Sequence, residues 1–316
     1  MIEMDTFSNL VRIGRYAVKY IDLNEGDHKI VVLPDGNRSY LRLDDVAKDN
    51  VLVTVDGETK RLWLNHRAGM DVAEFKLIRV GAEVTRYHLG ASRYSDSHIR
   101  LKGDARLSIA PAGVGWNLPG KHVFPIPEYQ WDKCKVHPYD YDMWLQEVIY
   151  GYHLGIDLYA RRGAQVVSAS DGEIIAIRHF DPARQKEDYW GTMLAVKGED
   201  GFVYIYCHMD YFEEEITLGS IIHAGDPIGP VGKMGFESKP IPPHLHFEML
   251  VLENPRNFRF AFDSSGRFLP DDIKGFAVNP RHFLVEWYEQ TKRVWRNDTC
   301  NHQDIKDGCE CNPSHS

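Results

Sequence analysis

The sequence predicts a mainly β protein: a small N-terminal β-sandwich or barrel, then a folded antiparallel sheet domain with a C-terminal helix. Three observations support this prediction. Short alternating or β-branched runs recur between glycine-containing turns along most of the chain. A segment rich in proline and glycine, residues 111–131, separates two series of such runs. At 316 residues, the chain is long enough for two domains with separate cores.

Composition and charge exclude several classes of protein. The content of 43% hydrophobic and 26% charged residues is ordinary for a globular protein, and five cysteines are too few and too unevenly placed for a disulfide framework. A net charge of −9 argues against nucleic-acid binding, because such proteins usually carry a basic face. No run approaches the roughly 18 apolar residues of a membrane span. No signal peptide is visible, so we expect a cytoplasmic chain, or a secreted or periplasmic one whose signal was removed.

Residues 1–118 are predicted to form a β-rich accessory domain. The runs Val51–Val55 and Lys60–Leu64 flank Asp56-Gly57, a dipeptide that favours the tight turn of a hairpin. Further short strands are predicted at Tyr40–Leu43, Phe75–Val80, Val84–Leu89, His98–Lys102 and Arg106–Ala110. The histidines of this region are scattered, and we find no catalytic constellation in it.

Residues 119–296 are predicted to form the second domain. Its expected strands are Val166–Ser168, Glu173–Arg178, Met193–Val196 and Phe202–His208. His208 ends the last of these, where a side chain can reach a cleft, whereas Cys207 faces the other way and is expected to be buried. Asn279 and Pro280 suit the cap and first position of a C-terminal helix. Residues 297–316 are expected to be a flexible polar tail, although Cys300, His302, Cys309 and Cys311 also allow a second metal site.

A pair of histidines lies in the run Gly235–Leu250, around which the second domain is organised. On a strand, His244 and His246 project from one face with their Cα atoms roughly 6.6 Å apart. Glu248 shares that face, where it could orient a ligand histidine or simply line a surface. Two imidazoles on one face can bind a metal if other ligands come from elsewhere. Taken alone, the pair favours two surface histidines on an exposed strand.

The stretch Gly151–Tyr159 offers the missing ligands. His153 and Asp157 lie on one face of a predicted strand, but a straight strand would place their Cα atoms roughly 13 Å apart. Zinc ligands must each come within roughly 2.0–2.2 Å of the ion, so the chain must bend between them. Gly155 tolerates such a bend.

Five motifs together resemble the lysostaphin-type zinc metallopeptidases, the peptidoglycan endopeptidases that include the β-lytic enzymes. The motifs are HLGID, RRGAQVVSASDGEI, YIYCHMD, AGDPIGPVGKMG and PPHLHFEM, and the resemblance covers residues 148–252. It implies a sheet related to barrel-sandwich hybrids, with a groove across it. It further implies one Zn²⁺ per chain, held by His153, Asp157 and His246, and a catalytic pair formed by His208 and His244.

The activity implied by this resemblance is hydrolysis of peptide cross-links or bridges of peptidoglycan, with peptidoglycan peptides as the partner. The chain lacks an HExxH motif, so a histidine rather than a glutamate is the expected base. Two alternatives are a non-catalytic relative that binds wall peptides or a protein partner, and a lipoyl- or biotinyl-like carrier using Lys233. The prolines of the FESKPIPP stretch depart from the family pattern beside the groove. Asn117, in the proline- and glycine-rich segment, is a candidate for blocking the open zinc position.

Overall fold

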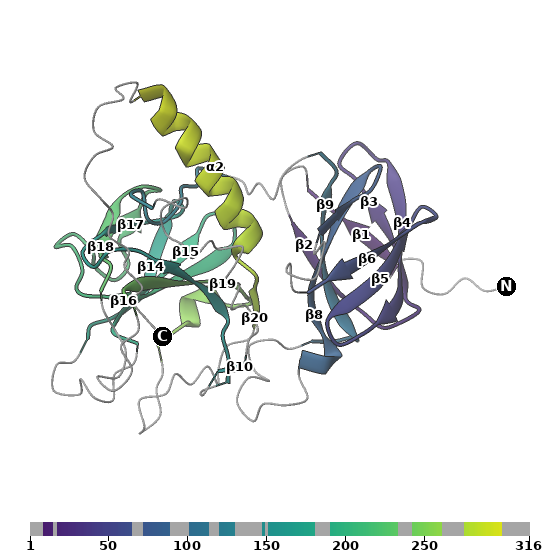
Figure 1. Cartoon of the computed structure of the whole chain (residues 1–316), viewed down its shortest axis with the longest axis horizontal. Coiled ribbons are helices and arrows are strands. Elements are labelled where there is room, and N and C mark those ends of the chain that lie inside the picture. The colour runs from purple at the N-terminus through teal and green to yellow at the C-terminus, as the bar shows by residue number, and fades with distance from the viewer. Residues whose placement is uncertain are drawn as a thin grey trace, which may run out of the picture. The chain divides into compact units, whose positions relative to one another are not determined.

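The computed structural model describes residues 9–14, 18–64, 72–88, 101–113, 120–129, 147–148, 151–180, 190–232, 242–260 and 275–298. The chain divides into two compact units, Met1–Pro119 and Gly120–Ser316, coloured purple to blue and teal to yellow in Figure 1. Both are built mainly from β-strands, as predicted, and the α-helix of the described residues is α2 (Arg281–Asp298). None of the described helices is long and apolar enough to cross a membrane.

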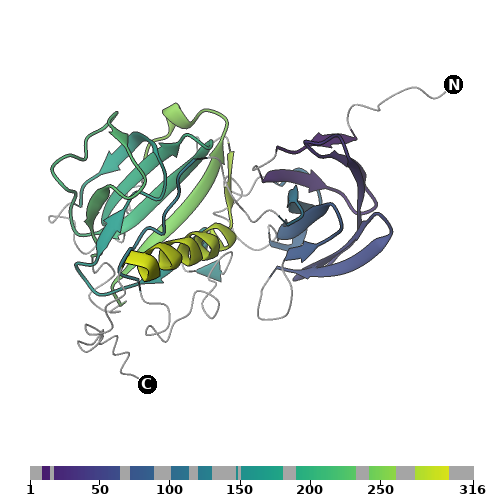
Figure 2. The ribbon, with the colours of Figure 1, turned by 90° about the horizontal axis from the view of Figure 1, so that it is seen from above.

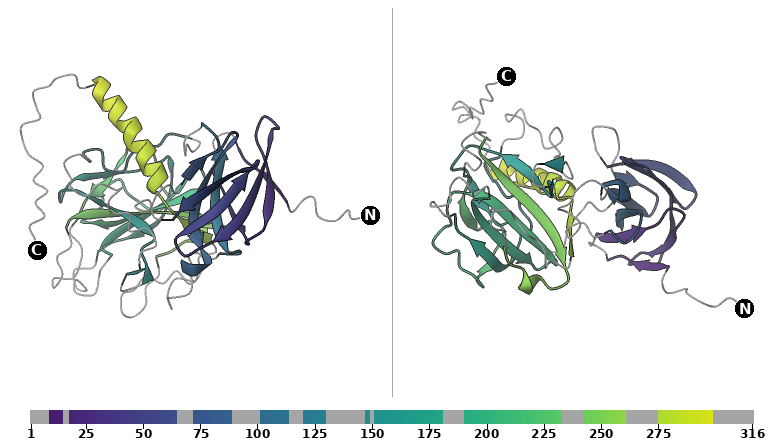
Figure 3. Two further views of the ribbon diagram at one scale, coloured as in Figure 1. Left: turned by 45° about the vertical axis from the view of Figure 1, so that its right-hand side comes forward. Right: turned by 90° about the horizontal axis from the view of Figure 1, so that it is seen from below.

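The N-terminal unit is a sandwich of two sheets (Figure 3). One sheet has the order β1 (Leu10–Arg12), β3 (His28–Val32), β4 (Arg38–Val46), β5 (Asn50–Val55) and β6 (Glu58–Trp63). The other has the order β2 (Lys19–Leu23), β9 (Ala105–Pro111), β8 (Ile78–Thr85) and β7 (Val72–Glu74). Apolar side chains of both sheets, such as Val53 and Leu107, share one buried cluster. A short 3-10 helix, η2 (Arg86–His88), follows β8.

Local sequence signals predict this unit well at its hairpin and poorly around Gly81. Strands β5 and β6 pair antiparallel, and Asp56 (φ 51°) and Gly57 (φ 88°) take the left-handed conformations of the predicted turn. The predicted strands Phe75–Val80 and Val84–Leu89 are wrong in their bounds, because β8 runs continuously through Gly81. Its pairing register with β9 shifts at a bulge between Ala82 and Val84. The strand predicted at His98–Lys102 falls mostly outside the described residues.

The C-terminal unit is centred on an antiparallel sheet. Its order is β12 (Gly155–Tyr159), β19 (His244–Leu252), β16 (Phe202–Met209), β15 (Thr192–Gly198), β14 (Gly172–Arg178) and β17 (Ile221–Ile222), with β20 (Gly275–Val278) also on β19. Two small antiparallel pairs accompany it: β10 (Glu147–Val148) with β11 (Gly151–Tyr152), and β13 (Gln165–Val167) with β18 (Pro227–Pro230). A 3-10 turn, η4 (Pro255–Asn257), follows β19.

Helix α2 packs against this sheet, as Figure 2 shows. Its start is the predicted one, because the Asn279 side-chain oxygen accepts a hydrogen bond from the Arg281 backbone N–H at 3.0 Å. Trp287 is buried against Tyr204 of β16 and Phe247 of β19, with ring centroids 6.1 and 6.4 Å away. The helix therefore supports the two strands that carry most of the candidate site.

Candidate metal centre

The candidate site lies where the central strands β12, β19 and β16 meet. In the antiparallel register of β12 and β19, Asp157 lies opposite His246 and Gly155 lies opposite Glu248. On the other side of β19, Cys207 of β16 lies opposite His246. Neighbouring strands are about 4.8 Å apart, so side chains on the shared face converge at this end of the sheet.

His153 reaches this point because the chain changes sheets just before it. Strand β11 ends at Tyr152 and belongs to a separate two-stranded sheet, whereas β12 begins at Gly155 in the central sheet. His153 therefore lies between strands, and its Nε2 comes to 3.1 Å from Asp157 Oδ1. The bend that the sequence required between these two residues is present.

The three predicted metal ligands form a compact set. His246 Nδ1 is 2.9 Å and His153 Nε2 is 3.1 Å from Asp157 Oδ1, and one ligand atom from each residue lies within 4.8 Å of the other two. Ligand atoms around a tetrahedral zinc ion are about 3.4 Å apart, given bonds of about 2.1 Å. Two imidazoles and one carboxylate are also ligands that zinc prefers. The residues present therefore fit one zinc ion with a fourth position open.

His208 and His244 lie beside the same ligand set, and each has one ring nitrogen anchored to a backbone carbonyl. His244 Nδ1 donates a hydrogen bond to the Pro242 carbonyl at 2.8 Å, and His208 Nδ1 donates to the Trp190 carbonyl at 3.2 Å. Since a carbonyl only accepts, both neutral rings carry their proton on Nδ1, and their Nε2 atoms are unprotonated. The two ring centroids are 4.7 Å apart. The chain thus places two proton acceptors beside the ligand set.

The backbone fixes His208 in an unusual conformation. Its φ of 68° lies in the left-handed region, which costs energy for a residue with a side chain. Its N–H donates to the Trp190 carbonyl at 3.1 Å, and its own carbonyl accepts from Gly232 at 2.9 Å. These bonds hold the strand end in place and turn the imidazole out of the regular alternation of β16.

Burial and neighbouring charges set the ionisation of the cluster. Burial and the nearby histidines hold the pKa of His208 well below its usual value of 6.5, and burial also lowers the pKa of His244 against the pull of Asp157. Although burial opposes it, the charges of His244 and His153 hold the pKa of Asp157 well below its usual range. Near neutral pH, the site therefore combines an ionised Asp157 carboxylate with the neutral imidazoles of His208 and His244.

His246 differs from the other two because carboxylates contact both of its ring nitrogens. Asp157 contacts Nδ1, and Glu248 Oε1 accepts a hydrogen bond from Nε2 at 2.7 Å. Although burial opposes them, these bonds raise the pKa of His246 to about 10. Glu248 does not line a surface, because the structure shows it buried in contact with His246.

Trp190 is a residue of the site that the sequence did not indicate. Its indole stacks on the His208 ring at an interplanar angle of 12° and meets the His246 ring edge-on, with ring centroids about 6 Å away in both cases. Its carbonyl is the acceptor that orients His208. A lone tryptophan before a strand matches no motif. Its backbone carbonyl could not be recognised as an acceptor either, because every residue has one.

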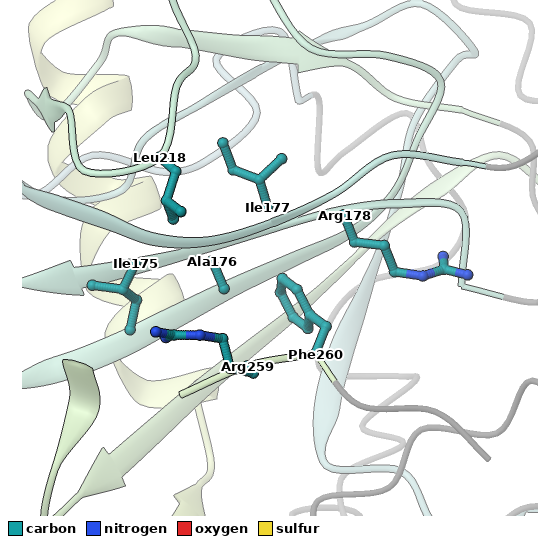
Figure 4. Close-up of a pocket in the computed structure, with 7 residues that line it drawn as sticks. All are labelled: Ile175, Ala176, Ile177, Arg178, Leu218, Arg259 and Phe260. Carbon is teal, nitrogen blue, oxygen red and sulfur yellow. The ribbon is translucent and has the colours of Figure 1, made fainter. Parts of the chain in front are cut away.

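Several other candidates lie outside the described residues: Asn117, Lys233, most of the FESKPIPP stretch, and Cys300, His302, Cys309 and Cys311. Figure 4 shows a separate hollow of about 240 Å³ beside β14. Its lining is mainly apolar, and its two arginines already donate to carbonyls, Arg178 to Gly191 and Arg259 to Phe258. None of the five candidate site residues lines this hollow.

Comparison with known proteins identifies relatives of this unit. Residues 151–258 match Peptidase family M23. Over 103 residues the chain is 31% identical to the peptidoglycan DD-endopeptidase ShyB of Vibrio cholerae, which covers 33% of this chain and 21% of the relative. Over 95 residues it is 30% identical to the cell division protein DipM of Caulobacter vibrioides, covering 30% and 14%. The chain thus spans less than a quarter of either curated relative.

Among solved structures, the chain is similar to the catalytic domain of the antimicrobial peptidase lysostaphin from Staphylococcus simulans. The identity is 24%, the match covers 44% of this chain and 83% of that one, and the TM-score is 0.30. A second similar structure is the catalytic domain of a prophage-encoded M23 protein, EnpA, from Enterococcus faecalis. There the identity is 22%, the coverage is 43% and 82%, and the TM-score is 0.30.

Proposed function

We propose that this chain, whose residues 151–258 form a domain of peptidase family M23, is a zinc endopeptidase that hydrolyses peptide cross-links or bridges of peptidoglycan. The observation that carries the proposal is the convergence of five side chains from three separate segments of the sequence. Three supply ligand atoms for one ion. The other two, His208 and His244, lie beside these ligands with their Nδ1 atoms anchored to backbone carbonyls. The name of the Vibrio relative, a peptidoglycan DD-endopeptidase, supports the substrate class.

In this proposal His153 Nε2, Asp157 Oδ1 and His246 Nδ1 hold the zinc ion. When bound, the ion lowers the pKa of a coordinated water to about 7 and so supplies a nucleophile near neutral pH. Of the pair His208 and His244, one neutral ring would accept the proton of the nucleophile through Nε2, and one protonated ring would donate a hydrogen bond to the oxyanion of the substrate. Asp157 Oδ2 lies 3.6 Å from His244 Nε2, so it stabilises a positive charge on that ring.

The proposal includes a division of labour along the chain. Residues 119–296 contain all five site residues and constitute the peptidase part, with α2 as its C-terminal helix. Residues 1–118 form an accessory β-domain. The tail predicted at residues 297–316 overlaps α2, which extends through Asp298. Because peptidoglycan lies outside the cytoplasm, we propose that the protein acts there.

The test separates zinc binding from hydrolysis. His208→Ala is expected to retain zinc and lose turnover of purified peptidoglycan, because this ring contributes no ligand atom. His246→Ala is expected to lose both, because it removes a ligand. Zinc content by atomic emission and digestion of defined cross-linked muropeptides are the two measurements. Full zinc occupancy in His246→Ala would contradict the ligand assignment.

A second candidate is a non-catalytic protein that binds wall peptides or a protein partner at the same site. It is favoured by the second curated relative, whose name describes a cell division protein and not a peptidase. Against it stands the presence of all five residues with both proton acceptors oriented. Turnover of peptidoglycan that stops on addition of a chelator and returns with Zn²⁺ supports the enzyme. Saturable binding without release of any muropeptide supports the binding protein.

A further inference from the structure

We propose that Glu248 is a positioning residue of the metal centre. It holds the His246 ring so that Nδ1 faces the ion and Nε2–H faces away from it. This inference rests on the proposed function, because it takes His246 as a zinc ligand. Glu248 itself is not a ligand in this arrangement. It acts through His246, and its contribution is the orientation and proton placement of that ring.

The register of the sheet explains how the glutamate reaches the ring. Glu248 follows His246 by two residues on β19, so both side chains project from the same face. Its Oε1 accepts a hydrogen bond from His246 Nε2 at 2.7 Å. The opposite ring nitrogen, Nδ1, lies 2.9 Å from Asp157 Oδ1. Each nitrogen of the imidazole thus has one defined partner, and only one of those partners belongs to the ligand set.

Gly155 leaves the space that this arrangement needs. It lies opposite Glu248 on β12, and a Cβ atom there would lie 2.7 Å from His246 Nε2 and 2.8 Å from His246 Cε1. Any side chain at this position would therefore collide with the ring where the glutamate meets it. The glycine that allows the chain to bend after His153 also makes room for the contact between His246 and Glu248.

Burial strengthens the hydrogen bond between Glu248 and His246. Glu248 is 5% exposed and His246 is 3% exposed, so water does not compete for either group. A hydrogen bond to a carboxylate is stronger than one between neutral groups, and a low local dielectric strengthens it further. The contact is therefore strong enough to select one tautomer and one ring orientation.

Selection of the tautomer matters because a neutral imidazole can bind zinc only through its bare nitrogen. If the proton sits on Nε2, then Nδ1 is free to bind the ion, and Nδ1 is the nitrogen that faces Asp157 and His153. A carboxylate at the far nitrogen also increases the electron donation of the ring to the metal. Removal of the acceptor would permit the other tautomer and a flipped ring, both of which lack a zinc-binding nitrogen at this place.

Three variants of the full chain test the proposal. Glu248→Met removes the acceptor but fills the buried space. Glu248→Gln keeps an oxygen that can accept from Nε2–H. Glu173→Gln removes a half-buried carboxylate of β14 that contacts Arg256 and serves as the matched control. The zinc dissociation constant of each metal-depleted protein is measured by competition with a chromophoric chelator, and the visible spectrum of each Co²⁺-loaded protein reports ligand geometry.

Zinc affinity is expected to fall about 10- to 100-fold in Glu248→Met, the range typical of lost partners behind ligand histidines. The loss should be smaller in Glu248→Gln and absent in Glu173→Gln. The Co²⁺ bands should shift in Glu248→Met and return toward the wild-type spectrum in Glu248→Gln. Equal zinc affinity in wild type and Glu248→Met would overturn the proposal.

One measurement does not depend on the folding of any variant. In Zn²⁺-loaded wild type with ¹⁵N-labelled histidine, long-range ¹H–¹⁵N spectra should show His246 bound through Nδ1 and protonated on Nε2. Binding through Nε2 would overturn the positioning role directly. If affinity depends on Glu248 but the wild type releases no muropeptide, the peptidase proposal fails and this inference stands. If the wild type is active and affinity is independent of Glu248, only this inference fails.

Discussion

Replacement of Gly155 by alanine is the sharpest test of the site geometry. A Cβ atom at this position would lie 2.6 Å from the Phe247 carbonyl oxygen and 2.7 Å from His246 Nε2, whereas ordinary contacts begin at 3.4 Å. The ring or the strand must therefore move by about 0.7–0.8 Å, if van der Waals contact is to be restored. Metal ligands tolerate deviations of only about 0.2 Å. We expect zinc affinity to fall at least about 10-fold, as for other changes behind a ligand.

The matched control is Gly172→Ala on β14. A Cβ atom there would be crowded to a similar degree, at 2.5 Å from the Lys197 carbonyl oxygen and 2.8 Å from Val196 Cγ1, but no site residue is near it. Both variants should lose about 1–3 kcal/mol of unfolding free energy through overpacking. Only Gly155→Ala should lose zinc affinity in a chelator competition assay. Similar zinc affinities in the two variants, whether high or low, would refute the reasoning.

Three further predictions concern stability and reactivity. Trp287→Ala should lower the unfolding free energy in urea by about 3–5 kcal/mol, because Trp287 of α2 is 2% exposed between the helix and the sheet and its removal leaves a cavity. Cys207 is buried and burial raises the pKa of its thiol, so iodoacetamide should label it only in denaturant, and rapid labelling of the native protein would contradict its placement. His208 has a pKa below its unfolded value of 6.5, so its contribution to stability is complete above pH 6.5 and is lost as the pH falls from 6.5 through the lower folded pKa. Metal-free wild type should therefore lose more stability than His208→Asn when the pH is lowered from 7 to 5, and parallel pH curves would disprove this.

The sequence predicts those parts of the fold that local chemistry decides. Asp56-Gly57 forces a left-handed turn, so the hairpin of β5 and β6 follows from two residues and their flanking strands. The start of α2 likewise follows from Asn279 as a cap. The strand bounds near Gly81 could not be predicted in this way, because pairing of β8 with β9 carries the strand through a glycine that locally favours a break.

In the candidate site, too, some features follow from local sequence and others depend on strand pairing between distant segments. The residue types and spacing of His153, Asp157, His244 and His246 are visible in the sequence, but the distance between the first two depends on where one sheet ends and another begins. That change of sheet at Gly155 is set by pairing with β19, a strand about 90 residues further along the chain. The acceptor role of Trp190 could not be predicted, because any residue offers a backbone carbonyl.

The partners of the three central histidines support the separation of roles among them. His246, the proposed ligand, donates its far N–H to a carboxylate, which increases the electron density available to a metal. His208 and His244 instead donate Nδ1–H to neutral carbonyls, which fix the tautomer, although the Asp157 carboxylate lies 3.6 Å from Nε2 of His244. A ring that must gain and lose a proton during each turnover benefits from that weaker anchor, since a carboxylate partner would hold the proton more tightly. In the proposed function, the carboxylate behind His246 therefore suits a ring that holds an ion, and the carbonyls behind His208 and His244 suit rings that move protons.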